Sequence, residues 1–339
     1  MEYVRDFVTR ERIDCSLRMS GQLILARGPG GRARLRVLTG LLRRLDLPGD
    51  PLDDEMLQRA LRLRPQFTGD PRTGPAAVRL PVAGTLHPIR LLAGLAERVL
   101  ALGGSTFENA RVSSIGRGSP VRLEMANGEV LAREVVVATA GYTPDLGLFR
   151  GRILPVHLRA VVTDPLDARA WKQIGWAGRE GVLDSRRLFN YFRRTEDDRV
   201  VFGGGVPRYR WGGCTAEGTN SPAAFEKVNA QLVRTFPAGA IPRMAGGWTG
   251  VIGYTLDGLP AVHFLPDRPS VLHVVGWCGH GVALSMASGE WVSRILCDGA
   301  VPEDLPWYRQ QPPLVPTEIG RWLGFRLAAQ AMMFLDGLS

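Results

Sequence analysis

The sequence predicts an α/β protein with an α+β second lobe, and three stretches of the chain carry that prediction. Residues 271–296 combine a β-branched apolar run, a glycine-rich turn and apolar residues at three- and four-residue steps, which indicates a buried strand followed by a helix. Residues 134–138 are a second apolar run, of the kind found in buried parallel strands. Residues 154–205 contain longer, half-exposed strands, which favour an antiparallel sheet.

The composition is that of an ordinary globular protein. The chain has 339 residues, of which 45% are hydrophobic, so it can form two domains or one α/β unit with a second lobe. Its four cysteines show no CxxC spacing, and we expect neither a disulfide framework nor a metal site. Residues 1–15 are too highly charged to resemble a secretory signal peptide, and no uncharged run looks like a membrane span. We therefore expect a cytoplasmic protein.

The net charge of +9 at pH 7 raises the question of nucleic-acid binding. Arginine supplies nearly all of the positive charge, and the arginines are spread along the chain on polar faces of predicted helices, as Arg62 and Arg64 are. No motif that interleaves aromatic and basic residues occurs. We expect no nucleic-acid partner and a mild attraction for acidic small molecules.

Residues 1–83 form the first segment in chain order. Asp53 or Asp54 can cap a helix here, Glu55 adds negative charge to its first turn, and Pro65 stops it. The expected elements are a helix within 1–14, a strand at 21–26, helices at 33–45 and 53–63, and a strand at 78–80.

Residues 84–150 form the second segment. Pro88 suits the first turn of a helix, and Asn127-Gly128 is a strong hairpin signal. The last strand of this segment runs into the small residues Ala138 to Gly141, where something flat can approach the backbone. The expected elements are a helix at 89–102 and strands at 106–115, 121–126 and 130–138.

Three further segments complete the chain: residues 151–250, 251–300 and 301–339. The first holds the antiparallel strands, the second the strand, turn and helix described above, and the third a tail with a terminal helix. The expected elements of the first are strands at 154–163, 188–193 and 199–202, glycines at 203–205, a helix at 223–236 and a glycine-rich return at 246–250.

The turn at 276–281 predicts a ligand site. A helix that opens on glycines leaves its first N–H groups unpaired and its positive dipole end exposed. We therefore expect a negative group at Gly279 to Val282, although turns of this kind also occur in α/β proteins without a ligand there.

Five segments together resemble the D-amino-acid oxidase and glycine oxidase superfamily of FAD-dependent oxidoreductases, and within it the gamma-glutamylputrescine oxidase type. They are HPIRLLAGLAERVLALGG, VVVATAGYTP, LFNYFRRTEDDRVVFGGG, GWTGVIGYTLDGLP and GWCGHGVALSMASGEWV, in this order along the chain. The resemblance implies an incomplete FAD-binding parallel-sheet domain, from 84–150 and 251–300, with an antiparallel-sheet substrate domain at 151–250. Residues 1–83 would be a helical segment of the substrate lobe.

The resemblance also implies the residues of a cofactor site. Val112 would lie against the adenine side of FAD through its backbone. The residues expected close to the flavin are Ala138, Thr139, Ala140 and Gly141. The residues expected beneath the pyrimidine edge of its ring system are Gly279, His280, Gly281, Val282 and Ala283. His280 has an alternative role, which is to satisfy backbone groups at the start of the helix.

Three residues are the expected lining of the substrate space above the flavin: Tyr191, Arg193 and Trp248. Tyr191 and Arg193 are two residues apart and share one face of a strand, so they could instead form an exposed cross-strand ladder. Trp248, between glycines, could instead be a packing residue.

The sequence departs from the family pattern in two places. Some relatives attach FAD to a cysteine shortly before the segment YTLDGLP, where this chain has Gly250 and Val251, so we expect non-covalent FAD. The family also begins with a strand, a GxGxxG turn and a helix that hold the FAD pyrophosphate, and no GxGxxG occurs in this sequence. A late start or shortened gene would explain this, and so would a second chain that supplies the unit.

The resemblance implies oxidation of the C–N bond of an amine or amino acid by hydride transfer to FAD, with oxygen or another acceptor reoxidising the flavin. No catalytic acid or base is predicted, because an unprotonated amine can drive hydride loss. Arginines in the second lobe favour substrates that carry a carboxylate. The alternative is an N-terminally truncated, non-catalytic remnant or partner subunit that does not hold FAD alone.

Overall fold

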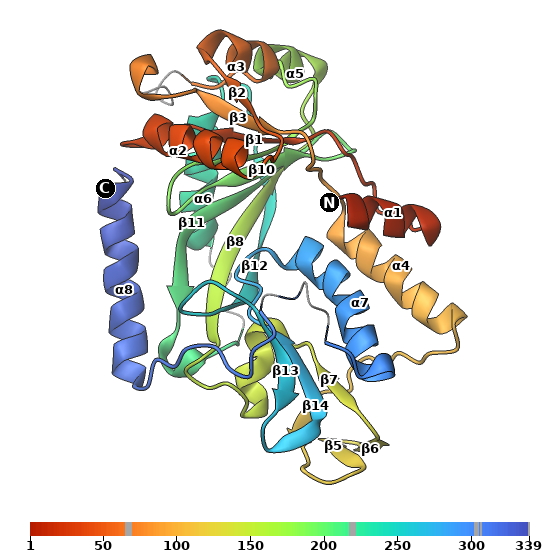
Figure 1. Cartoon of the computed structure of the whole chain (residues 1–339). Helices are drawn as coiled ribbons and strands as arrows, with labels where there is room; N and C mark the ends of the chain where they lie inside the picture. Colours follow the sequence, from red (N-terminus) through yellow and green to blue (C-terminus); the bar gives the residue numbers. More distant parts are fainter. Residues whose placement is uncertain (65–69, 217–221, 302–304, 306, 338–339) are drawn as a thin grey trace.

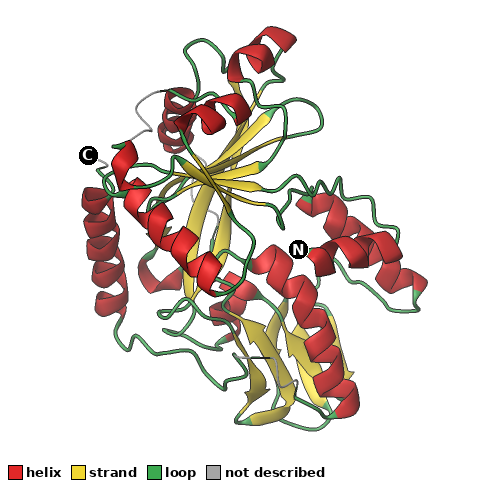
Figure 2. Cartoon of the chain, turned by 45° about the horizontal axis from the view of Figure 1, so that its top comes forward, coloured by secondary structure: helices red, strands yellow, loops and turns green. Residues whose placement is uncertain are grey.

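The computed structural model describes residues 1–64, 70–216, 222–301, 305 and 307–337, and Figure 1 shows the whole chain. The predicted fold class is confirmed, because one large, mostly antiparallel sheet occurs together with a smaller sheet that contains a parallel strand pair. The strands of the large sheet lie between helices, and the small sheets form the lower end of the molecule (Figure 2). None of the described helices is long and apolar enough to cross a membrane.

The large sheet has eight strands in the order β12-β8-β11-β10-β9-β1-β3-β2. Its neighbours pair antiparallel except β1 and β9, which are parallel. The strands are β1 (Gln22–Leu25), β2 (Asp50–Leu52), β3 (Ala77–Leu80), β8 (Leu154–Thr163), β9 (Gly181–Asp184), β10 (Tyr191–Arg194), β11 (Val200–Tyr209) and β12 (Met244–Tyr254). Strands from 22–80 thus join the sheet built by 154–254.

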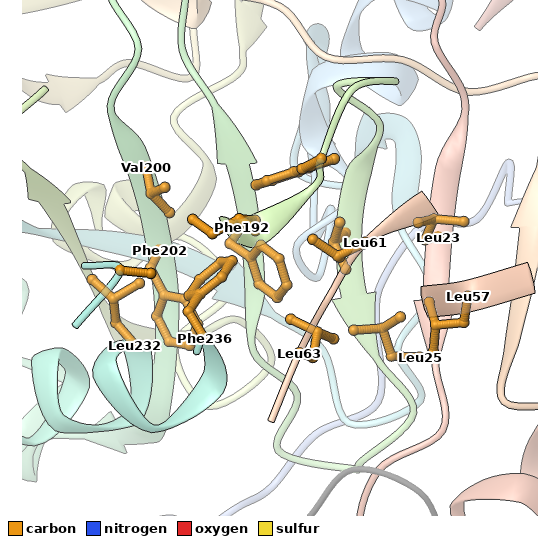
Figure 3. Packing of buried hydrophobic residues seen from close by; sticks show 14 of the residues in the cluster. Leu23, Leu25, Leu57, Leu61, Leu63, Phe192, Val200, Phe202, Leu232 and Phe236 are labelled. Carbon is orange, nitrogen blue, oxygen red and sulfur yellow. The ribbon is translucent and has the colours of Figure 1, made fainter. Parts of the chain in front are cut away.

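One face of this sheet forms the main hydrophobic core (Figure 3). The Phe192 and Phe202 rings stack with centroids 5.7 Å apart, and Phe236 meets Phe192 edge-on at 5.2 Å. Each fully buried aromatic side chain stabilises the fold by about 2–3 kcal/mol. The helices on this core are α3 (Asp54–Ala60), α5 (Ala168–Ile174) and α6 (Pro222–Thr235).

The rest of the chain forms two three-stranded sheets. The first has the order β13-β14-β7, with β13 (Ala261–Leu265), β14 (Arg268–Val275) and β7 (Val135–Val137). The second is the meander of β4 (Val112–Ile115), β5 (Val121–Met125) and β6 (Gly128–Ala132). The remaining helices are α1 (Glu2–Arg10), α2 (Gly31–Arg44), α4 (Pro88–Ala101), α7 (Gly281–Asp298) and α8 (Glu318–Leu335).

Two strand predictions in this region were wrong. The expected strand at 130–138 is two strands, since β6 returns along β5 through the confirmed turn at Asn127-Gly128 while β7 joins β14 in another sheet. The expected strand at 106–115 is regular only from Val112, where pairing with β5 begins. β7 is a parallel strand as predicted, paired with β14, but it is not buried on both faces, because Val136, which projects from the face opposite Val135 and Val137, is exposed.

Several elements were not predicted from the sequence: β2, β9, β13, α5 and most of β12. Residues 246–250 belong to β12, which pairs with β8 along its length. β11 likewise continues through its glycines, with an irregular register between Gly204 and Arg208. α3 ends at Ala60, before Pro65, which lies outside the described residues.

The Asp53 cap gives a first prediction. Its side chain accepts a hydrogen bond of 2.8 Å from the Met56 N–H at the start of α3. Asp53→Ala should lower the free energy of unfolding by about 1 kcal/mol, because one helix donor loses its acceptor. Urea denaturation measures this, and Asp53→Asn, which keeps the acceptor, should stay near wild type. Equal losses for both variants would contradict a capping role.

Candidate functional site

The carboxyl ends of β7 and β14 meet at one place in the fold (Figure 1). The two strands are parallel neighbours, with Val135 opposite Val271 and Val137 opposite His273. The segment 138–141 after β7 and the segment 276–281 after β14 therefore leave the sheet side by side. Edges of this kind are where ligands bind in open parallel sheets.

The turn after β14 is held in an unusual backbone conformation. Gly276, Cys278 and Gly279 all have positive φ, of 82°, 50° and 93°. The buried Cys278 thiol donates to the Gly276 carbonyl at 3.0 Å, and its N–H donates to the carbonyl of Gly253 at 3.2 Å. The Thr255 N–H also reaches this sulfur at 3.4 Å. These hydrogen bonds hold the turn against the end of β12.

With the turn held in this way, the amino terminus of α7 is uncapped and exposed to solvent. Its N-cap residue, His280, makes no capping side-chain bond, and Gly279, His280 and Val282 are exposed. The first N–H groups of an α-helix have no partner within the helix, and the dipole makes that end positive. The N–H groups of Gly281, Val282 and Ala283 are thus available to an anion, and the anion expected here from the sequence stays a prediction.

The segment after β7 is only partly available to a ligand. Ala138 and Thr139 are exposed, whereas Gly141 is buried. A Cβ at Gly141 would lie 2.8 Å from Val251 Cγ1 and 2.9 Å from the Ile252 carbonyl carbon. The group that approaches Gly141 closely is therefore β12, and the predicted approach of something flat to the backbone of 138–141 stays a prediction for the exposed Ala138 and Thr139.

Val112 lies in the same region as these segments. Its half-buried side chain packs in the hydrophobic cluster that contains Val137 and Val271, from the two parallel strands. The structure therefore places Val112 in the core formed with the two parallel strands, near Val137 at the end of β7.

The three expected substrate residues lie on one face of the large sheet. Tyr191 is directly opposite Gly203, which is opposite Ala160, which is opposite Trp248, so these four side-chain positions point the same way. Arg193, two residues from Tyr191, shares that face. The Tyr191 ring lies over Gly203, since a Cβ there would come within 2.0 Å of its Cζ.

This row forms a platform of two aromatic residues with small residues between them. Tyr191 is 40% exposed and Trp248 is 47% exposed, so Trp248 is not a buried packing residue. β12 leads from Trp248 to Gly253 over about 17 Å, at the usual rise per residue. A Cβ at Gly253 would lie 3.0 Å from the Ala140 carbonyl, so the same strand connects the platform to the strand ends.

Arg193 is the polar group of this face. Within the described part of the chain its guanidinium forms no hydrogen bond or close ion pair, although it is half-buried. Burial lowers the pKa of Arg193, and the charge of Asp197 opposes this effect. A half-buried cation without a partner is suited to a carboxylate.

The sequence did not predict the residues that hold the turn after β14 against the end of β12. Gly253, Thr255 and Cys278 act through contacts between segments more than 20 residues apart. A cavity of about 680 Å³ also lies between α1, α4 and α7, and none of the predicted site residues lines it. Its lining includes Tyr3, Arg10, Ser285, Met286 and Glu290.

Comparison with known proteins gives consistent results. The family model described as "FAD dependent oxidoreductase" (DAO) matches residues 1–295. Gamma-glutamylputrescine oxidoreductase of Escherichia coli (strain K12) is 27% identical over 304 residues, which cover 87% of this chain and 65% of that protein. The probable oxidoreductase OrdL of Haemophilus influenzae is 26% identical over 265 residues, covering 75% of this chain and 57% of that protein. The chain thus spans less than two thirds of these relatives.

Solved structures share the fold. Glycine oxidase from Geobacillus kaustophilus has a TM-score of 0.75 at 19% identity, covering 91% of this chain and 79% of that chain. L-proline dehydrogenase from P. horikoshii has a TM-score of 0.73 at 18% identity, covering 91% and 80%.

Proposed function

The chain belongs to the DAO family of FAD dependent oxidoreductases, and from that premise we propose that it oxidises the C–N bond of a small amine or amino acid. The observation that carries the proposal is the uncapped, exposed amino terminus of α7 beside the end of β7. Bound FAD would supply the acceptor for a hydride from the carbon next to the amine nitrogen, and oxygen or another acceptor would reoxidise it.

The residues at the strand ends fit the ring end of a non-covalently held flavin. The N–H groups of Gly281, Val282 and Ala283 would hold negative charge at the pyrimidine edge. Ala138, Thr139 and Ala140 have side chains small enough for a ring to lie against the backbone, and Val112 would support the adenine side. The His280 side chain makes no capping bond at the helix start, which favours its alternative role as a flavin contact.

The platform residues would position the substrate. Tyr191 and Trp248 would bracket the reacting carbon and exclude water, while Arg193 would hold a carboxylate. The named substrates of the relatives, gamma-glutamylputrescine and glycine, both carry an amine and a carboxylate, which supports this assignment. No acid or base is assigned, because an unprotonated amine suffices.

The pyrophosphate of FAD needs a partner that these residues do not supply. In the described small sheet the outer edge of β7 is unpaired, and Val136, on the face opposite Val137, is 40% exposed. An open strand edge accepts a further strand, and a helix following that strand could cover the exposed face. We propose that a GxGxxG-bearing strand and helix, from a further segment or a second chain, complete the cofactor site there. The alternative function is a non-catalytic partner subunit.

A flavin-binding measurement on the purified chain tests this proposal. Flavin absorbance retained after FAD is added and the sample desalted would support it. A well-folded, colourless chain would favour the non-catalytic alternative. Flavin retention only on addition of a peptide with the strand, GxGxxG turn and helix of the family pattern would support completion by a second segment.

Two glycines at opposite ends of α7 give a matched pair of variants. Gly279 (φ +93°) and Gly299 (φ +65°) both have positive φ and open space where a Cβ would lie. Alanine at either position costs about 1 kcal/mol of backbone strain. Gly279→Ala should also weaken FAD binding roughly tenfold by fluorescence titration, because it disturbs the ligand-facing turn, whereas Gly299→Ala should not. Equal FAD affinities of the two variants would contradict the binding of the flavin at this turn.

A further inference from the structure

The carboxyl-terminal helix α8 has one buried side and one exposed side. It lies at the left of Figure 1, against β11 of the large sheet. Trp322 and Phe325 face inward, and Phe325 packs against Tyr209 with ring centroids 6.2 Å apart. Both ends are fixed, since Glu318 accepts the Gly212 N–H at 2.7 Å and Asp336 accepts the Leu188 N–H at 2.9 Å. The helix therefore presents a constant outer surface.

That outer surface is apolar over about half of the helix circumference, at 100° per residue. Leu327 is 55% exposed and Phe334 is 84% exposed. Its members, in order around the helix, are Ile319, Gln330, Leu323, Phe334, Leu327, Gly320, Ala331, Gly324, Leu335 and Ala328, and all of them are exposed. Gln330 is the single polar side chain among them.

The size of this surface calls for a partner. Its large side chains leave on the order of 500 Å² of apolar area in contact with water, at the upper end of what monomeric proteins expose. A stable interface buries about 800 Å² on each partner. The α8 surface supplies most of that area.

We propose that the occupant is α8 of a second copy of this chain, packed antiparallel across a twofold axis at Leu327. In that register Leu327 meets its own equivalent, Leu323 faces Ala331, and Phe334 faces Gly320. Leu323 and Phe334 each thus face a small residue, while Ile319 faces Leu335 at the ends of the contact. Pairs of bulky and small residues give the self-complementarity that a twofold interface requires.

The charges of the helix agree with this occupant. An interfacial membrane helix carries many Lys and Arg residues beside its apolar face. α8 has two arginines: Arg321 pairs with Glu318 at 2.8 Å, and Arg326 stacks over Trp322 at 4.1 Å. Neither faces a like charge in the antiparallel pair.

Sedimentation velocity over a range of concentrations tests the proposal. The chain should be a dimer, and Leu327→Arg should raise the dimer dissociation constant roughly 100-fold or more, because two charges then meet at the axis. Leu131 on β6 is a matched control, since it is also 55% exposed, and Leu131→Arg should leave the dimer intact. Circular dichroism checks that both variants fold.

A charge pair tests the register. Leu323→Glu and Ala331→Lys should each weaken the dimer, whereas the double variant should restore it, because position 323 of one copy faces position 331 of the other. Three results would overturn the proposal: a monomeric wild-type chain, a dimer unaffected by Leu327→Arg, or a double variant that stays dissociated. So would a monomer whose binding to phosphatidylcholine–phosphatidylglycerol vesicles is lost in Leu327→Arg.

Discussion

Asp184→Asn is expected to lower the free energy of unfolding by about 3–5 kcal/mol, because it leaves a buried arginine without its counter-charge. The Asp184 carboxylate accepts Arg186 Nε at 3.0 Å and Nη2 at 2.7 Å, and both side chains are 2% exposed. Arg27 lies 3.6 Å from the same carboxylate and is itself largely buried, which lowers the pKa of Arg27 to about 10. Urea denaturation measures the loss.

Asp70 provides a matched control for this variant. Asp70 and Arg72 have the same spacing in the sequence and the same bonds, with Nε to Oδ1 at 3.1 Å and Nη2 to Oδ2 at 2.9 Å, but they lie at the surface. Water and salt screen such a pair, so Asp70→Asn should leave the unfolding midpoint within measurement error. Similar losses for the two variants would contradict the importance of burial.

The Asp184 variant should also affect the candidate platform. The second carboxylate oxygen of Asp184 accepts the Asn190 N–H at 3.2 Å, immediately before β10. β10 carries Tyr191 and Arg193, so a loosened turn would disorder both. The buried ion pair therefore links the stability of the large sheet to the face that would bind substrate.

The elements predicted correctly carry their signals within a short stretch of sequence. The Asp53 cap, the Asn127-Gly128 turn and the apolar spacing of α7 each act within a few residues, so pattern alone suffices. β12 contains four glycines and was expected to be a loop. It is a strand because β8 pairs with it throughout. Glycine is required at position 247 because a Cβ there would lie only 2.6 Å from the Phe225 ring.

In the candidate site, too, the features encoded by local sequence were predicted and those that depend on distant segments were not. The glycine turn and helix after β14 predicted an anion site from local sequence, and the turn and uncapped helix occur as expected. The alignment of Tyr191 with Trp248 depends on the register of four strands, and the contact of Gly253 with Ala140 depends on packing between two sheets. Neither could be obtained without the pairing of distant segments.

His273 makes the stability of the chain depend on pH. It lies in the middle of β14, fully buried, and within the described residues neither ring nitrogen forms a hydrogen bond. Its ring packs 4.6 Å from that of Phe149, and it is directly opposite His263. Burial, and then the charge of His263, lowers the pKa of His273 from 6.5 to about 4, and the main chain of Arg309 offsets only part of this effect.

The free energy of unfolding should therefore fall by about 3 kcal/mol as the pH falls from 7 to 4. Between these values the unfolded chain binds a proton at His273 and the folded chain does not, so acid favours unfolding; above the unfolded pKa the full stability is present. His273→Leu should remove this component and raise stability at pH 7, because an unsatisfied polar group leaves the core. Urea denaturation across this pH range measures the pH-dependent part of the free energy of unfolding. It compares wild type, His273→Leu and His280→Leu, which serves as an exposed-site control. Parallel wild-type and His273→Leu curves would mean that the buried imidazole is not the group that acid titrates on unfolding.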